Sequence, residues 1–357
     1  MPKNIVLCCE NQSDPYSGNV IKLYQCLSRD ENQTVFFYPA MSMRVAGQIP
    51  LVWTRWKELS FGAGLSDELR SAYLFLMANY EPGDNLFFFG AGRGAYVVRA
   101  LAGILHLAGL LDRGNEMMVP HVISLASRLD NRTFVRARQL KSTFSRECPI
   151  HFVGIWDSPA KFGWVTNPFP LRMPFSINNP SIMIGRHALA IDERRTLFTP
   201  SLWEAQKEFG GPKDLKQVWF RGVHSDICGG YAEEESGLAN ISLGWMLQEA
   251  IRYGLNINAE AMRSVLFAEE TNGGPKPKSI LHNSLRYPFQ LFEIIPAVVY
   301  DNAKGKWYWR VNLGRPRHIP LDSLIHNSVL ERRDLPKNLP ERFTIEETDP
   351  SLGERSL

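Results

Sequence analysis

Apolar and polar positions follow two alternating patterns along the chain. Short apolar runs that end in turn residues predict buried strands, and stretches with apolar residues three and four positions apart predict helices between them. The predicted strands cover residues 5–9, 34–38, 85–89, 150–156 and 217–223, and the clearest predicted helices cover 65–80, 95–111 and 241–253. Strands that alternate with helices indicate an α/β fold, with a mostly parallel sheet in a three-layer αβα sandwich.

Two regions depart from this alternation. Residues 158–186 are rich in proline, asparagine, phenylalanine and methionine, and we expect a lid-like excursion over the sheet. After about residue 260 the periodicity weakens, which predicts an irregular extension over 260–357 with one strand at 306–311. No linker divides the chain, so we expect a single domain over 1–357.

Composition and charge exclude several classes of protein. The chain has 357 residues, 44% of them hydrophobic and 22% charged, which is typical of a soluble globular protein. The formal charge of +3 is too small to predict nucleic-acid binding, and we interpret the short basic clusters at 194–195 and 315–317 as solvated surface. Five irregularly spaced cysteines predict buried free thiols rather than disulfides or a zinc site.

The ends and the apolar runs of the chain predict where it resides. The first residues lead straight into a strand with no cleavable signal pattern, and no apolar run is long enough for a transmembrane segment. We therefore expect a cytoplasmic protein, or one exported without a signal peptide. No cofactor is predicted, and the oligomeric state stays open.

A glycine cluster between the third predicted strand and its helix allows two interpretations. Residues 90–95, "GAGRGA", fit the G-x-G-x-x-G/A fingerprint of dinucleotide-binding proteins. Asp112 falls about 20 residues downstream, where such proteins place an acidic residue that binds the ribose. In such proteins that acid ends a second strand, whereas the residues before Asp112 have a helical pattern. The dinucleotide interpretation is therefore the weaker of the two.

The same cluster also resembles the G-x-S-x-G nucleophile elbow of α/β hydrolases, with Gly92 in place of serine. Asp157 and His224 follow it in the chain order that such hydrolases use, each after a predicted parallel strand. In that mechanism the aspartate orients the imidazole, and the imidazole takes the proton of the nucleophile. We expect Gly92, Asp157 and His224 to meet at one edge of the sheet.

Longer motifs identify a family. The chain resembles the type VI secretion lipase-effector family, whose elbow reads G-F-S-R-G-A-Y-x-x-R. The resemblance covers most of the chain and includes the following segments: 61–84, 90–99, 154–158, 187–203 (a helical stretch with a D-E-x-R core in the family), 218–231 and 241–250. It implies an α/β-hydrolase-like fold and a hydrolase that cleaves phospholipid or other ester bonds by a Ser-Asp-His mechanism.

The departures from the family pattern gather around the expected chemistry. Gly92 replaces the nucleophile, and Glu10, Asn11 and Gln12 replace a D-G-T segment that lies near it in the family. Glycine has no side chain with which to attack a carbonyl, so covalent catalysis through position 92 is impossible. We expect Glu10, Asn11, Arg93 and Asp226 to line a binding site.

Several hypotheses follow for the function. The first is a pseudo-hydrolase that binds a lipid or ester-like ligand, or a protein partner, without serine catalysis. The alternative is an active ester or phospholipid hydrolase, which either uses a water activated by His224 or normally carries serine at position 92. Ser13, Ser42 and Glu10 are weak substitute nucleophiles, and a dinucleotide-binding protein is a further alternative. Asp157, His224 and Asp226 include metal-ligand residue types, but no metal is assigned.

Overall fold

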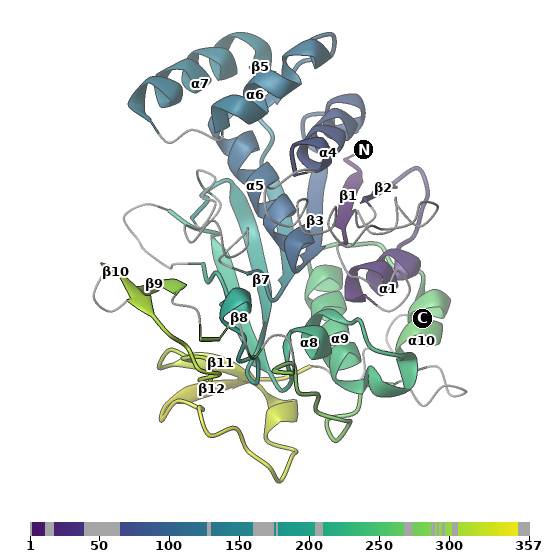
Figure 1. The fold of residues 1–357 in the computed structure, drawn as a ribbon. Coiled ribbons are helices and arrows are strands. Elements are labelled where there is room, and N and C mark those ends of the chain that lie inside the picture. The colour runs from purple at the N-terminus through teal and green to yellow at the C-terminus, as the bar shows by residue number, and fades with distance from the viewer. Residues whose placement is uncertain are drawn as a thin grey trace, which may run out of the picture.

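The computed structural model describes the following residues: 2–10, 18–38, 65–126, 130–159, 175, 178–203, 210–267, 274–286, 290, 293–294, 297–301 and 306–348. Within them the expected strand and helix alternation is present (Figure 1). The central feature is an eight-stranded sheet in the order β12-β11-β8-β7-β6-β3-β1-β2, and every pairing described within it is parallel.

The strands of this sheet are β1 (Asn4–Cys9), β2 (Gln33–Tyr38), β3 (Asn85–Ala91), β6 (Ile150–Trp156), β7 (Ile182–Ala190), β8 (Asp214–Phe220), β11 (Ser323–His326) and β12 (Phe343–Glu346). The helices are α1 (Asn19–Cys26), α4 (Leu65–Asn79), α5 (Arg93–Ala108), α6 (Val119–Ala126), α7 (Asn131–Phe144), α8 (His224–Cys228), α9 (Gly237–Arg252) and α10 (Ala259–Phe267). Two small antiparallel pairs, β4 (Leu110–Leu111) with β5 (Ser145–Arg146) and β9 (Ala297–Asp301) with β10 (Lys306–Arg310), lie outside the main sheet.

Helices cover both faces of the sheet, which confirms the predicted three-layer αβα sandwich. Side chains on successive strand positions point to opposite faces, so β1 contributes Ile5 and Leu7 to one core and Val6 and Cys8 to the other. The first core is closed by α4, α5 and α6, and the second by α1, α9 and α10. In Figure 1 these two groups of helices lie on either side of the strands.

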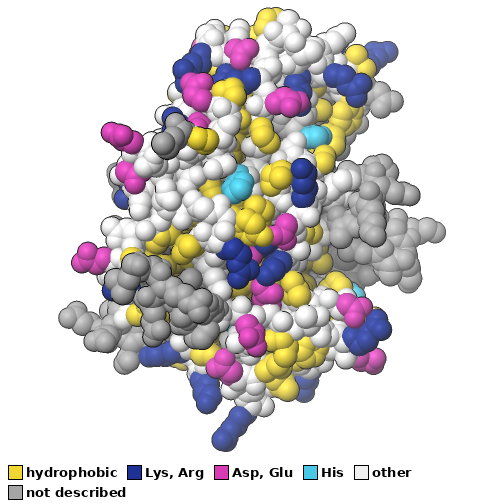
Figure 2. All heavy atoms as spheres, turned by 180° about the vertical axis from the view of Figure 1, so that it is seen from behind, with side chains coloured by type: hydrophobic (Ala, Val, Ile, Leu, Met, Phe, Trp, Pro, Cys, Tyr) yellow, Lys and Arg dark blue, Asp and Glu magenta, His cyan; other side chains and the backbone are white. Residues whose placement is uncertain are grey.

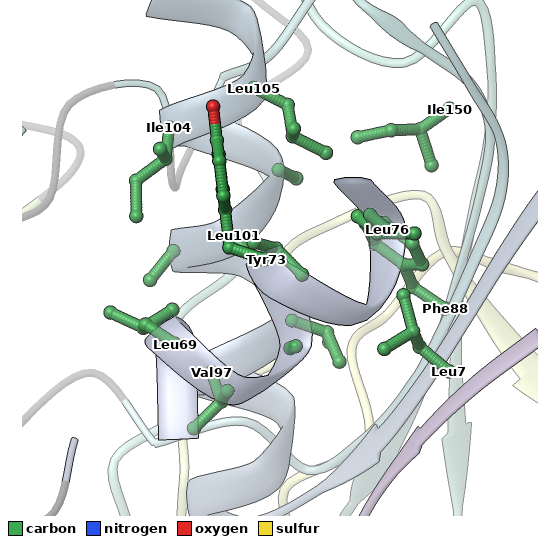
Figure 3. Close-up of a cluster of buried hydrophobic side chains, with 14 of the residues drawn as sticks. Leu7, Leu69, Tyr73, Leu76, Phe88, Val97, Leu101, Ile104, Leu105 and Ile150 are labelled. Atoms are coloured by element: carbon green, nitrogen blue, oxygen red, sulfur yellow. The ribbon is translucent and has the colours of Figure 1, made fainter. Parts of the chain in front are cut away.

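The first core fixes the helix that begins beside the glycine cluster. Leu69, Tyr73 and Leu76 lie three and four positions apart on α4 and form the stripe that packs against α5 and the sheet (Figure 3). From α5, Val97 and Leu101 enter the same cluster. Apolar burial on this scale holds the start of α5 in a fixed position under the carboxyl ends of the strands.

Two glycines of the cluster are required by close packing. A Cβ at Gly94 would lie 1.9 Å from the Cys9 carbonyl oxygen, and a Cβ at Gly90 would lie 2.5 Å from the Gly94 backbone. Only glycine lets the first turn of α5 approach β1 and the end of β3 this closely. The spacing Gly90–Gly94 therefore follows from the packing of the strand, the turn and the helix.

The structure corrects the expected irregular regions. Strand β7 begins at Ile182, inside the segment expected to form a lid, and it runs through the middle of the sheet. Buried Arg186 and His187 interrupt its apolar pattern and so conceal it. Residues 160–174 and 176–177 lie outside the described part, so the lid stays a prediction.

The expectation for the C-terminal region is also only partly right. The strand predicted at 306–311 is present as β10, but β11 and β12 join the main sheet where an irregular extension was expected. These strands are four residues long, too short to give a clear period-2 pattern. The helical stretch expected over 187–203 is wrong: it holds the end of β7 and a single 3-10 turn, η2 (Thr196–Phe198).

The remaining expectations concern thiols, membranes and charge. All five cysteines are free and buried, as predicted. In the part of the chain that the structure describes, no helix is both long and apolar enough to cross a bilayer. Figure 2 shows acidic and basic side chains interspersed on one face of the molecule, with hydrophobic ones between them.

Candidate functional site

Gly92 occupies the turn between β3 and α5 in a conformation that L-residues rarely adopt. It is the N-cap of α5, with φ 52° and ψ −116°, and its N–H donates to the Trp156 carbonyl at 3.1 Å. A Cβ built at this position would lie 3.2 Å from His224 Nε2 and 3.5 Å from Cε1. A side chain at position 92 would therefore point directly at the imidazole, as the nucleophile of an elbow must.

Asp157 and His224 meet as the sequence predicted. Asp157 Oδ2 lies 2.7 Å from His224 Nδ1, and the two residues are 1% and 7% exposed. Because an ionised carboxylate only accepts hydrogen bonds, Nδ1 carries the proton and Nε2 is the nitrogen that faces Gly92. Asp157 follows β6 directly, whereas His224 opens α8 four residues after the end of β8.

Arg317 also binds Asp157, a contact that the sequence analysis did not predict. Its Nη1 lies 2.6 Å from Oδ1 and its Nη2 lies 3.0 Å from Oδ2, so the guanidinium grips both carboxylate oxygens. Burial alone would raise the pKa of Asp157, but the charge of Arg317 and the bonds from Arg317 and His224 hold that pKa well below its usual range. The carboxylate stays ionised although it is buried.

The interpretation of the basic clusters as solvated surface is wrong for Arg317, which is 9% exposed, and for Arg195, which binds a buried carboxylate. That carboxylate belongs to Glu193. Arg194 and Arg315 are exposed as expected. In each basic cluster, one arginine therefore pairs with a buried carboxylate and the other stays exposed to solvent.

Glu193 is a second residue that sequence reasoning missed. It is fully buried, and its oxygens accept from the backbone N–H of His224 at 3.1 Å and of Arg195 at 2.8 Å, and from the Ser284 hydroxyl at 2.8 Å. Burial raises its pKa, but the hydrogen bonds and charge of Arg195 outweigh burial and lower it to about 2. The D-E-x-R core of the segment 187–203 was the signal that could have identified it.

Of the residues expected to line a binding site, Glu10 and Arg93 lie beside the glycine turn, and Asn11 is not described. Glu10 is 3% exposed and directly follows Cys9, the last residue of β1, whose carbonyl oxygen abuts Gly94 in the first turn of α5. Arg93 is the first residue of α5 and pairs with Glu68 at 3.4 Å. Asn11, like Ser13 and Ser42, lies outside the described residues.

Asp226 turns away from the candidate site. Its Oδ1 lies 2.6 Å from His282 Nδ1 and its Oδ2 accepts from the Val223 N–H at 3.0 Å. His282 Nε2 in turn lies 3.2 Å from Glu235, and the Tyr231 ring stacks on the imidazole. These contacts fasten the segment 274–286 to the start of α8, and they engage both Asp226 oxygens within the fold.

Cys228 lies beneath the elbow, but its position does not suit a nucleophile. Its sulfur is 3.7 Å from His224 Nδ1, the nitrogen already bonded to Asp157, and not on the Nε2 side. The side chain is completely buried, and burial raises the pKa of its thiol well above the ordinary value. A thiol held in the neutral form is a poor nucleophile.

The dinucleotide interpretation is wrong in this structure. Asp112 follows the two-residue strand β4, which pairs with β5 and not with the main sheet. Its carboxylate pairs with Arg146 at 3.3 Å. A ribose-binding acid must end the strand next to the glycine-bearing strand, and the neighbours of β3 are β1 and β6.

Comparison with known proteins agrees with the geometry. The family described as T6SS phospholipase effector Tle1-like, catalytic domain, matches residues 3–249. The chain belongs to this family. It is also similar to the uncharacterized protein YEL023C of Saccharomyces cerevisiae, with 23% identity across 95% of this chain and 81% of the yeast protein.

Two solved structures are also similar to the chain at 14% identity. An uncharacterized protein from Pseudomonas aeruginosa has a TM-score of 0.43 over 77% of this chain and 49% of its own. The Tle1 effector bound to the VgrG spike of the type VI secretion system has a TM-score of 0.35 over 67% of this chain and 53% of its own. The chain thus spans about half the length of these two structures.

Proposed function

We propose that this member of the Tle1-like family is a pseudo-hydrolase, which binds a lipid or ester-like ligand or a protein partner without serine catalysis. One observation carries the proposal: His224 Nε2 lies 3.2 Å from the Cβ position of Gly92, so the imidazole faces a residue that offers no nucleophile. The acid and the histidine remain in contact at 2.7 Å. Binding is the use of such a site that needs no group at position 92.

The loss of a nucleophile has a large expected effect on rate. Removing the serine from a developed Ser-His-Asp site costs about six orders of magnitude in kcat. The oxyanion donors and the binding contacts of such a site still act on the ligand without it. The first turn of α5 supplies N–H groups of this kind at the elbow.

The test is restoration of the nucleophile. Gly92→Ser, Gly92→Ala and the parent chain are assayed on short- and long-chain esters and on phospholipid vesicles, each with and without His224→Ala. We expect no turnover by the parent or Gly92→Ala, and turnover by Gly92→Ser that His224→Ala removes. Turnover by the parent that His224→Ala abolishes would overturn the proposal.

The second candidate is hydrolysis by a water activated by His224. It is favoured by the tautomer, because Nε2 carries the lone pair that a general base needs and faces the position that lacks a side chain. It predicts parent turnover that Asp157→Asn lowers.

Membership of a type VI secretion effector family supports export without a signal peptide over a cytoplasmic location.

A further inference from the structure

Arg317 comes from a part of the chain that the family match does not reach. The match ends at residue 249, whereas Arg317 precedes β11 in the C-terminal region. Its side chain returns to the carboxyl edge of the sheet and is 6% exposed. The C-terminal region therefore contributes a buried charge to the pair formed by Asp157 and His224.

The guanidinium makes four hydrogen bonds at this edge. Two go to the carboxylate oxygens of Asp157, at 2.6 and 3.0 Å. Nη1 also donates to the Ala190 carbonyl at 2.8 Å, and Nη2 donates to the Phe198 carbonyl. A planar fork that meets both oxygens of a carboxylate fixes its orientation as well as its charge.

We propose that Arg317 is a positioning residue, which fixes the Asp157 carboxylate and through it the tautomer and ring orientation of His224. Asp157 has φ 40°, a strained conformation for a residue with a side chain, and needs contacts to hold it. Oδ1 accepts from Arg317 and from the Ala190 N–H at 3.1 Å, and Oδ2 accepts from Arg317 and His224.

The same guanidinium also binds Phe198, the residue whose ring packs against the His224 imidazole. Phe198, whose carbonyl accepts from Arg317, places its ring 4.6 Å from the His224 ring at 52°. Loss of Arg317 would therefore free the hydrogen-bond partner of Nδ1 and the aromatic neighbour of the ring together. Each change alone would let the ring rotate away from Gly92.

The charges around the pair are balanced in the structure. Arg317 compensates the negative charge of Asp157, and Arg195 compensates that of Glu193, which binds the His224 backbone N–H. With its own charge compensated by Arg317, the Asp157 carboxylate acts on His224 chiefly by orienting the ring. Arg317 thus sets geometry, which a spectroscopic measurement detects separately from stability.

Arg332 offers a matched control. It lies in the same C-terminal region, its side chain is 12% exposed, and its Nη1 donates to the carbonyls of Pro277 and Ser279 at 2.7 and 2.8 Å. Its recorded contacts are with the 277–279 segment and Asp334 rather than with Asp157 or His224. Replacing it removes a comparable set of structural bonds and leaves the candidate site intact.

The experiment measures the imidazole ¹⁵N signals of His224 in the parent chain, Arg317→Gln, Arg317→Lys and Arg332→Gln, assigned with His224→Ala. We expect one fixed tautomer in the parent and in Arg332→Gln, averaged signals in Arg317→Gln, and partial recovery in Arg317→Lys. In a Gly92→Ser background, Arg317→Gln should lower kcat on the order of 10²-fold with little change in KM.

Unchanged His224 signals in Arg317→Gln would overturn the proposal, as would equal changes in Arg332→Gln. If Arg317→Gln does not fold, Arg317→Lys decides, because it keeps the charge without the fork, and parent-like signals would overturn the proposal. The inference rests on the proposed function only in treating Asp157 and His224 as a functional pair. The NMR arm uses the Gly92 chain and does not depend on turnover, whereas parent turnover that His224→Ala abolishes would overturn the proposed function alone.

Discussion

The Cβ position of Gly92 lies 3.2 Å from His224 Nε2. The two residues are 132 positions apart, and each is held from its own side: Gly92 by the turn into α5, and His224 by Asp157 at Nδ1 and Glu193 at its backbone N–H. His224 Nε2 faces position 92 although the residue there has no side chain. This is the arrangement on which the proposed function rests.

Substitution of Gly92 by alanine should be tolerated but costly. Its φ of 52° disfavours a side chain, and the new Cβ would press on the His224 ring at 3.2 Å. We expect the free energy of unfolding to fall by about 1–3 kcal/mol. Denaturation in urea measures this, and a stabilised Gly92→Ala variant would contradict the turn geometry.

Gly94→Ala should be far more damaging than a glycine substitution in another helix. A Cβ at position 94 would meet the Cys9 carbonyl oxygen at 1.9 Å, and that atom belongs to the backbone of β1, which pairs with β2 on one side and β3 on the other. We expect a loss above about 4 kcal/mol, or no folded protein. Gly244→Ala in α9 is the control: nothing lies within 4 Å of its Cβ position, so we expect a gain of about 0.5–1 kcal/mol. Equal effects at the two positions would refute the packing argument.

Asp157→Asn should destabilise the fold as well as the site. The substitution leaves the buried guanidinium of Arg317 without a matching negative charge, which costs about 3–5 kcal/mol when one partner of a buried pair is removed. Asp322→Asn is the control, because its pair with Arg342 is 65% and 70% exposed and should contribute less than about 1 kcal/mol. Thermal and urea unfolding of both variants check the difference. A small effect of Asp157→Asn would mean that Arg317 finds other partners.

Acid should weaken the fold through Glu193. Its pKa is lowered from 4.5 to about 2, so its stabilising contribution is present above pH 4.5 and is lost as the pH falls toward 2. A shift of this size corresponds to about 3 kcal/mol. Glu193→Gln should therefore lose less stability than the parent between pH 4.5 and 2, although it starts lower at pH 7. Unfolding curves over this range test the prediction, and parallel pH profiles would refute it.

The local pattern of residues along the chain was sufficient to predict the central frame. The apolar runs at β1, β3 and β6 predicted strands that are buried, because a strand covered on both faces needs mostly apolar side chains. The run at β2 predicted a fourth strand, which the structure places at the edge of the sheet with four half-buried residues. The order of Gly92, Asp157 and His224 predicted which residues would meet, since the carboxyl ends of parallel strands share one edge.

The contacts around that frame depend on segments that meet only in the folded chain. Arg317 and Arg315 stand in the same short basic cluster, and nothing local distinguishes the one that reaches Asp157. Strand β7 carries buried Arg186, whose charge is met by Glu249 at 2.5 Å and Asp214 at 2.8 Å. A buried charge is tolerated only where a distant segment supplies its partner, and that partner is a property of the assembled fold.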